Sequence, residues 1–297
     1  MAQAEIGLDD LRLVRAIADA GSLTAAARSL GVDHSTAFRR LNAIEARLGT
    51  RLFERRRDGY LPTPAGHAAS EAARRIADEM ASLALHLAGS DLRPYGVVRV
   101  TTTDTLVDLL TPALAAFRVR YPEIVPELVV ANAFLSLSRR DADVAIRPAA
   151  SAPEELVGRR TATIATAIYG TPELTPDGAA AWRPEDQVWI GYDASLSHLA
   201  AARWLAANVP DTRIGYRADT LLAMRAAARA GIGLALLPCF LADPEPALFR
   251  VQPPDPALAT GLWLLTHPEL RRVPRVRVFL DHMAEALAGL KGEFGGA

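Results

Sequence analysis

The side chains best suited to specific recognition lie on one face of a helix predicted between Asp33 and Leu48. Arginine can donate two hydrogen bonds to the O6 and N7 atoms of guanine, while serine and threonine suit phosphate oxygens or base edges. Polar and aromatic side chains recur along this face, namely His34, Ser35, Thr36, Phe38, Arg39, Arg40 and Asn42. We therefore predict that this face contacts double-stranded DNA in the major groove.

A basic hairpin is predicted directly after this helix. Residues 51–61 indicate two short strands around Asp58-Gly59, a strong signal for a β-hairpin. Arg55 and Arg56 lie on this hairpin, and we expect them to contact the DNA backbone or the minor groove. Thr63 follows the hairpin as the predicted cap of the next helix and completes the set of predicted DNA contacts.

Positive charge is concentrated in this part of the chain. Residues 21–57 contain eight arginines and three acidic residues, a net charge of +5, whereas the formal charge of the whole chain is −1. Phosphate backbones favour such a concentration through the release of counterions. The alternative is a solvated basic surface, in which Arg47 and Arg51 pair with Glu45 and Glu54.

Two predicted helices joined by a tight turn position these side chains. Ser22 can cap the first helix and Gly31 can end it in the left-handed conformation, while Asp33 caps the second and Gly49 ends it. Both inner faces are apolar at helical spacing, with Leu23, Ala26, Ala27, Leu30, Leu41, Ile44 and Leu48. A helix over residues 8–20 completes the core, so a helix-turn-helix followed by a wing is predicted.

Several short motifs occur in order along this segment: Gly21-Ser22-Leu23-Thr24-Ala25-Ala26-Ala27, Leu30, Ile44-Glu45, Leu48-Gly49, Leu52-Phe53-Glu54-Arg55 and Thr63-Pro64-Ala65-Gly66. In combination they resemble the LysR-type transcriptional regulators. The resemblance extends along the whole chain and is densest before residue 66. Members of that family usually carry serine where this chain has Phe38, so a base preference is not carried over. Phe38 could contact a thymine methyl group or pack on the helix pair.

A long helix is predicted after the wing. Pro64 suits its first position, and it is expected to run to about residue 87 before a break at Gly89-Ser90. Apolar residues recur in alternating steps of four and three, as in a coiled-coil seam, at Ala69, Ala73, Ile76, Met80, Leu83 and Leu87. The helix could instead pack on its own domain. We expect a dimer seam, and the resemblance implies a linker helix that pairs two chains.

Strands alternate with helices in the second half of the chain, which predicts α/β layers after a hinge at residues 91–95. Strands are expected at 96–101, 128–130, 143–146, 163–169, 188–192, 213–216 and 261–266, and helices at 104–121, 196–207, 220–230 and 276–290. The resemblance implies a two-lobed effector domain like the periplasmic binding proteins. The predicted protein is thus multidomain, of the α+β and α/β classes: a winged helix-turn-helix domain (1–66), a linker and dimerisation helix (67–90) and an effector-binding domain (91–297). Lobe 1 is expected at about 91–164 plus 261–297, and lobe 2 at about 165–260.

Candidate effector contacts lie at the ends of the predicted strands. Thr102, Thr103 and Asp104 stand where the first strand meets the following helix, and helix N-termini in open α/β sheets attract small anions. An ordinary strand–helix junction with a threonine cap is the alternative. Further candidates at equivalent positions are Arg147, Tyr192, Ser195 and Thr220. The negative charge of Asp104 argues against a simple carboxylate effector unless its side chain points away.

Composition and missing motifs exclude several classes of protein. There is no run of about 18 apolar residues and no basic and apolar leader at the start, so neither a membrane span nor a signal peptide is expected. The single cysteine, Cys239, excludes an internal disulfide and fits a reducing cytoplasm. Both a redox role and an inert buried thiol stay open for it. No HExxH or GxSxG motif or dinucleotide fingerprint occurs, so no metal, cofactor or catalytic residue is predicted.

These observations predict a cytoplasmic transcriptional regulator whose DNA heads respond to a small-molecule effector bound between two lobes. The expected partners are a two-fold symmetric operator, the effector, a second copy of the chain as a dimer or a dimer of dimers, and RNA polymerase. One alternative is a small-molecule binding protein or enzyme whose head serves protein contacts. Another is a nucleoid-type DNA binder with a ligand-free second domain.

Overall fold

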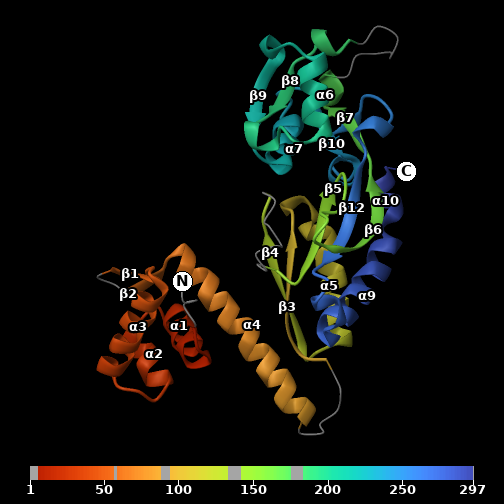
Figure 1. Ribbon diagram of the computed structural model, residues 1–297. Coiled ribbons are helices and arrows are strands. Elements are labelled where there is room, and N and C mark those ends of the chain that lie inside the picture. The colour runs from red at the N-terminus through yellow and green to blue at the C-terminus, as the bar shows by residue number, and fades with distance from the viewer. Residues whose placement is uncertain (1–5, 57–58, 88–93, 133–141, 175–182, 297) are drawn as a thin grey trace. The chain divides into compact units, whose positions relative to one another are not determined.

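The computed structural model describes residues 6–56, 59–87, 94–132, 142–174 and 183–296. The chain divides into two compact units, Met1–Arg93 and Pro94–Ala297, whose helices and strands are drawn in Figure 1. Each unit has its own hydrophobic core. No helix within the described ranges is long and apolar enough to cross a membrane.

The first unit, called the head below, contains α1 (Leu8–Ala20), α2 (Leu23–Ser29), α3 (His34–Leu48), β1 (Phe53–Arg56), β2 (Gly59–Pro62) and α4 (Pro64–Leu87). The predicted helix ends are confirmed. Ser22 Oγ accepts from the backbone N–H of Ala25 at 3.5 Å, and Gly31 and Gly49 have φ of 66° and 67°. Asp33 is the N-cap of α3, although its side chain makes no capping hydrogen bond. Leu30, expected on the inner face, is instead 37% exposed.

The wing hairpin closes against the rest of the head through two glycines. β1 and β2 pair in antiparallel register, with Phe53 opposite Pro62 and Arg56 opposite Gly59. A Cβ atom on Gly59 would lie 2.3 Å from the carbonyl oxygen of Gly21, and one on Gly66 would lie 1.9 Å from that of Leu52. These positions need glycine because any side chain would collide with backbone.

The long helix α4 packs part of its predicted seam inside the head. Ala73 is 5% exposed and Ala69 packs against the head core, and Arg74 forms an ion pair with Asp19 on α1. The intramolecular alternative therefore holds for the first turns of α4, while Met80 further along is 43% exposed. The side chains of residues 83 and 87, the break at 89–90 and residues 91–93 of the predicted hinge lie outside the described residues.

The second unit contains two groups of sheets. A five-stranded sheet has the order β4-β3-β5-β12-β6, in which β3 pairs parallel with β4 and β5 while β12 runs antiparallel to β5 and β6. Its elements are β3 (Gly96–Thr102), a short 3-10 helix η1 (Asp104–Leu106), α5 (Val107–Arg120), β4 (Ile124–Val130), β5 (Val144–Ala149), β6 (Val157–Ile164), β12 (Thr260–Thr266) and α9 (Pro274–Gly289). Figure 1 shows α5 and α9 alongside this sheet, where Phe117 and Phe279 meet with ring centroids 5.0 Å apart.

The other group comprises sheets of order β10-β7-β11 and β8-β9. Its elements are β7 (Thr166–Gly170), β8 (Trp189–Tyr192), the 3-10 helix η6 (Ala194–Leu196), α6 (Ala200–Asn208), β9 (Ile214–Ala218), α7 (Leu221–Arg229), β10 (Ala235–Pro238), α8 (Cys239–Ala242), β11 (Phe249–Arg250) and the 3-10 helix η8 (Pro256–Leu258). The last helix, α10 (Lys291–Gly295), follows α9.

Two of the differences between the predicted and the observed elements of this unit lie beside the cavity. The single strand expected at 163–169 is wrong: Ala165 separates β6 from β7, and the two strands belong to different sheets. The helix expected from residue 196 begins at Ala200, after η6. In both places the apolar pattern continues through a change of direction, because residues on either side of it are buried in the same core.

Candidate functional site

The helix α3 presents its polar side chains because its opposite face is fixed in the head core. The buried face consists of Ala37, Leu41 and Ile44. The exposed or half-buried residues include those predicted to contact DNA, namely His34, Ser35, Thr36, Phe38, Arg39, Arg40 and Asn42. In the described part of the chain, neither Arg39 nor Arg40 makes a hydrogen bond or an ion pair, so both guanidinium groups are available to a ligand.

The wing arginine Arg55 is held on α3. Its guanidinium donates to Asn42 Oδ1 at 2.6 Å and lies 4.6 Å from the ring centroid of Phe38. Phe38 also stacks with His34, with centroids 6.5 Å apart. A guanidinium over an aromatic face is stabilised by about 0.5–1 kcal/mol at an exposed site. Phe38 therefore packs within the head and supports Arg55, so α3 and the wing form one basic surface.

The wing is also tied to α3 through its backbone. Glu45 Oε1 accepts from the backbone N–H groups of Leu52 and Phe53 at 2.8 and 3.1 Å. The suggested pairing of Arg47 with Glu45 is wrong, because Arg47 forms its ion pair with Asp10 on α1.

Glu54 and Thr63 complete the contacts around the wing. Glu54 pairs with Arg56 at 3.1 Å. Thr63 Oγ1 donates to the carbonyl of Arg51 at 2.8 Å and accepts from the N–H of Gly66 at 3.1 Å, so it caps α4 and holds the base of the wing.

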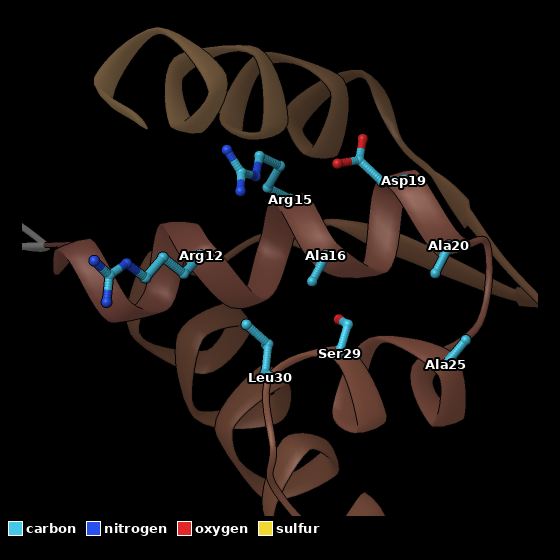
Figure 2. A pocket seen from close by; sticks show the side chains of 8 residues that line it. All are labelled: Arg12, Arg15, Ala16, Asp19, Ala20, Ala25, Ser29 and Leu30. Carbon is cyan, nitrogen blue, oxygen red and sulfur yellow. The ribbon is translucent and has the colours of Figure 1, made fainter. Parts of the chain in front are cut away.

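A separate hollow of about 660 Å³ lies on the head between α1 and α2. Figure 2 shows Arg12, Arg15 and Asp19 projecting from α1, with Ser29 at the end of α2 and Leu30 after it on the other side of the hollow. None of the predicted DNA contacts lines it. This hollow is therefore distinct from the basic surface of α3 and the wing.

The second unit contains a cavity of about 360 Å³ between the five-stranded sheet and the other group of sheets. It is lined from the ends of β3, β4, β5 and β6 on one side, and from β8, α6, α7, β10 and α8 on the other. This volume lies at the lower end of the range for small-molecule sites, which are typically clefts with a few polar groups among apolar walls.

The polar end of the cavity contains the buried guanidinium of Arg147 and the carboxylate of Asp104, which is hydrogen-bonded to Asn132. Arg147 is 4% exposed, and its guanidinium donates to the carbonyl of Ala131. Burial lowers the pKa of Arg147 from its ordinary value. Asp104 and Asn132 bind each other twice, since Asn132 Nδ2 donates to Asp104 Oδ2 at 2.9 Å and the backbone N–H of Asp104 donates to Asn132 Oδ1 at 3.1 Å. One carboxylate oxygen of Asp104 thus accepts from an amide, and the pair joins η1 to the residues that follow β4.

The opposite wall of the cavity is mostly apolar. It includes Leu236, Pro238, Phe240 and Leu258. Tyr192 lines the same wall, but its hydroxyl donates to the carbonyl of Leu236 at 2.7 Å and burial raises its pKa. Thr220 caps α7, with Oγ1 accepting from the N–H of Ala223 at 3.1 Å. A ligand here would meet an apolar surface on one side and Arg147 on the other.

Two family descriptions match the chain and together cover most of it. The "Bacterial regulatory helix-turn-helix protein, lysR family" matches residues 8–67, and the "LysR substrate binding domain" matches residues 93–288. The chain belongs to the LysR family of transcriptional regulators. This LysR-family regulator therefore binds DNA through its head and carries an effector-binding domain after it.

Relatives match this LysR-family regulator over nearly its whole length. The Mau operon transcriptional activator of Paracoccus denitrificans is 29% identical over 95% of this chain and 98% of its own. The regulator CrgA of Neisseria meningitidis is 28% identical over 94% and 96%. Among solved structures, CrgA aligns with a TM-score of 0.55 at 24% identity, covering 95% of this chain and 99% of that one. LysG from Corynebacterium glutamicum with bound effector Arg aligns with a TM-score of 0.63 at 20% identity, covering 96% and 99%.

The cavity of the LysR-family regulator brings together five of the seven residues predicted to contact an effector: Thr103, Asp104, Arg147, Tyr192 and Thr220. Thr102 does not line it, because this residue is fully buried and its hydroxyl donates to the carbonyl of Ile146 at 2.9 Å. Ser195 does not line it either. Its carbonyl oxygen lies 3.1 Å from Nδ1 of His198, and His198 does line the cavity.

Several lining residues were not predicted from the sequence. Asn132, His198, Arg203 and Phe240 all face the cavity. Asn132 follows the end of β4, so the strand-end rule that selected Arg147 would also have found it. Phe240 follows an apolar run and resembles any core residue in sequence. Cys239 beside it is buried, and burial raises the pKa of its thiol.

Proposed function

We propose that this LysR-family regulator binds a two-fold symmetric operator as a dimer or a dimer of dimers, under the control of a small molecule bound in the second-unit cavity. The observation that carries the DNA part is the continuous basic surface of α3 and the wing, in which Arg39 and Arg40 are available and Arg55 is held over Phe38. The base-edge contacts would come from α3, and the phosphate or minor-groove contacts from Arg55 and Arg56.

The chemistry of the cavity favours a small amphipathic effector with an acidic group. Arg147 would bind the acidic group, and the wall around Phe240 would cover the apolar part. Asp104 keeps its negative charge when one oxygen accepts from Asn132, so Arg147 would have to offset its repulsion of the acidic group. LysG, a structural neighbour of this fold, has been solved with bound effector Arg, which supports a small polar metabolite rather than a polymer.

Control would act through the arrangement of the two lobes. A ligand changes such an arrangement only if it binds one state more tightly than the other, and the cavity lies between groups of strands that a ligand would draw together. The change would alter the spacing of the paired DNA heads and their contact with RNA polymerase, in the cytoplasm.

The first experiment is selection of genomic fragments by the purified protein at low and moderate salt. We expect one shared two-fold sequence whose retention falls steeply with salt, because displaced counterions dominate the affinity. Weak, salt-insensitive retention with no shared sequence would contradict the proposal. It would favour a binding protein or enzyme whose head serves protein contacts.

The second experiment is a thermal-shift screen of small carboxylates and amino acids against wild type, Arg147→Met and Asp104→Asn. Arg147→Met keeps an unbranched apolar chain but removes the charge, so it should abolish the shift given by an acidic ligand. Asp104→Asn should preserve or increase that shift, because a negative charge is removed. A ligand that stabilises all three variants equally would not be bound at this end of the cavity.

A further inference from the structure

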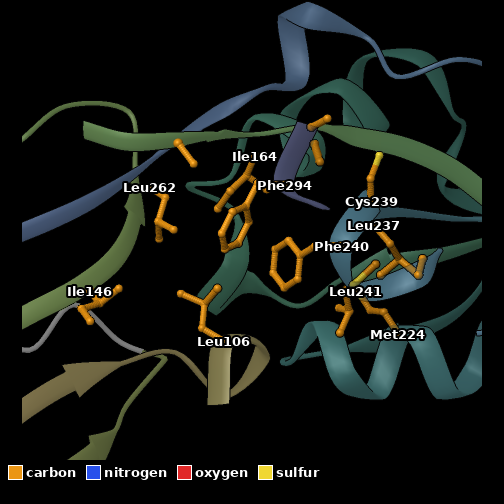
Figure 3. Close-up of a cluster of buried hydrophobic side chains, with 14 of the residues drawn as sticks. Leu106, Ile146, Ile164, Met224, Leu237, Cys239, Phe240, Leu241, Leu262 and Phe294 are labelled. Carbon is orange, nitrogen blue, oxygen red and sulfur yellow. The ribbon is translucent and has the colours of Figure 1, made fainter. Parts of the chain in front are cut away.

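The last helix of the chain forms part of the support of the cavity. α9 packs on the five-stranded sheet, whereas α10 contacts β6 and α8. Phe294 on α10 is fully buried, and its ring meets that of Phe240 edge to face with centroids 5.3 Å apart (Figure 3). Phe240 also lines the cavity. The ring of Phe294 therefore stands behind a wall that a ligand would touch.

Backbone contacts fix this segment at the junction between the two groups of sheets. The N–H of Ala165, the residue between β6 and β7, donates to the carbonyl of Phe294 at 2.8 Å, and the carbonyl of Ala165 accepts from the N–H of Cys239 at 2.9 Å. Arg250 donates to the carbonyl of Gly296 at 2.8 Å and forms an ion pair with Asp243. Residues 291–296 are thus bound to the point where the chain passes from one group of sheets to the other.

We propose that Phe294 is a positioning residue of the effector cavity: docking of residues 291–296 holds the Phe240 ring in place as the cavity wall, so docking and ligand binding strengthen each other. The inference rests on the proposed effector role of that cavity. Energetic coupling is reciprocal, because a ligand that binds the undocked state more weakly than the docked state must favour docking by the same factor.

A natural reporter of docking lies beneath the segment. Cys239 is the single cysteine of the chain and is fully buried. Gly296 has a φ of 68°, and a Cβ atom there would lie 2.9 Å from Cys239 Sγ. Gly296 therefore lies against the thiol, and we expect local opening of residues 291–296 to speed its alkylation by iodoacetamide.

The first arm of the test compares Gly296→Ala with Gly292→Ala in the full chain, using iodoacetamide and mass spectrometry. Alanine at 296 is strained by its left-handed backbone and by the contact with Cys239, whereas a Cβ atom at 292 meets nothing within 4 Å. A left-handed alanine costs about 1–2 kcal/mol, so Gly296→Ala should be alkylated about tenfold faster than Gly292→Ala. Equal rates would overturn the docking half of the proposal.

The second arm uses 8-anilinonaphthalene-1-sulfonate, an amphipathic anion that matches the cavity chemistry, as the probe. Saturating dye should slow the alkylation of Cys239 in wild type. It should slow alkylation by the same factor in Gly296→Ala and Gly292→Ala, because that factor is the ratio of the affinities of the dye for the docked and undocked states. Alkylation rates that saturating dye leaves unchanged in wild type and in both variants would overturn the coupling, because docking of residues 291–296 would then be independent of the ligand.

A further variant separates this inference from the proposed function. Dye binding that survives Arg147→Met would lie elsewhere, and the effector assignment of the cavity would then fail independently of docking. In that event Phe240→Ala tests the contact between the rings of Phe240 and Phe294 by itself. Faster alkylation of Cys239 supports a role of this contact in docking, and an unchanged rate overturns it. Phe240→Leu, which keeps an apolar contact, should restore slow alkylation.

Discussion

The arginines of the DNA-binding surface fall into two kinds. Arg55 is ordered before DNA arrives, because Asn42 and Phe38 fix its guanidinium. Within the described chain, Arg39 and Arg40 have no such contacts and must lose side-chain freedom on binding. Ordering one long side chain costs about 0.5–1.5 kcal/mol, so a preordered arginine keeps more of its contact energy. For the same contact with DNA, Arg55 should therefore contribute more to the affinity than Arg39 or Arg40.

Removing the free arginines tests the recognition surface directly. Arg39→Ala and Arg40→Ala should each weaken operator binding by about 1–3 kcal/mol if they reach base edges, and should lower the salt slope by about one for a phosphate contact. Arg213→Ala, an exposed arginine on the second unit, is the matched control and should change neither quantity. Gel shifts over a salt series give both values, and specific binding left intact in both head variants would contradict the assignment.

Phe38 offers a test of preordering. Phe38→Ser introduces the residue more usual in the family and removes the ring beneath Arg55. It should weaken DNA binding about two- to fivefold, the equivalent of the stacking energy. Phe38→Tyr keeps the ring and should bind like wild type. Equal affinities of the serine and tyrosine variants would show that Arg55 does not depend on Phe38.

Residue roles that depend on near neighbours could be predicted from the sequence, whereas roles that depend on distant pairs could not. Ser22, Thr63 and Thr220 cap helices that begin one residue later, so their patterns are local. The Asp104–Asn132 pair joins positions 28 residues apart, and nothing near either residue specifies the other. The sequence therefore predicts the negative charge of Asp104 at this site but not its hydrogen-bond partner.

At the scale of elements, the wing depends on close backbone approach. Gly66 lies at the start of α4, where a Cβ atom would collide with the Leu52 carbonyl that precedes β1. Gly66→Ala should lower the free energy of unfolding of the head by about 1–3 kcal/mol. Gly289→Ala, at a helical glycine where a Cβ atom meets nothing within 4 Å, should have no such effect. Denaturant titration followed by circular dichroism measures both, and a head that tolerates Gly66→Ala would refute the packing argument.

Elements bounded by caps and glycines could be predicted closely, whereas elements that change sheet without such signals could not. The bounds of α1 match the prediction because Gly21 ends the helix with a positive φ. The sequence predicts one strand across β6 and β7 because Ile164, Ala165 and Ala167 are all buried, and an unbroken apolar run gives no sign of a change of sheet. Ala165, the residue between these strands, also donates to the carbonyl of Phe294. The sequence therefore predicts neither the end of β6 nor the contact that holds the last helix there.

In the complete protein, the exposed part of α4 is the candidate surface for pairing two chains. The predicted seam of α4 is divided: Ala69 and Ala73 pack inside the head, while Met80 is 43% exposed beside a small hollow that Leu8 and Ile76 also line. Apolar residues spaced alternately four and three apart mark a helix face that packs against another element. This spacing does not distinguish packing on α1 from packing on a second copy of the chain.

A charge placed on the exposed part of α4 distinguishes the two. Met80→Glu should raise the dimer dissociation constant at least about tenfold, because a buried unpaired carboxylate is costly at an apolar interface. Val119→Glu alters an equally apolar side chain that is 86% exposed on the second unit, and it should leave the constant unchanged. Sedimentation velocity over a concentration series measures both. If Met80→Glu stays dimeric at wild-type concentrations, pairing does not depend on this part of α4, and the apolar pattern of the helix serves only its packing on α1.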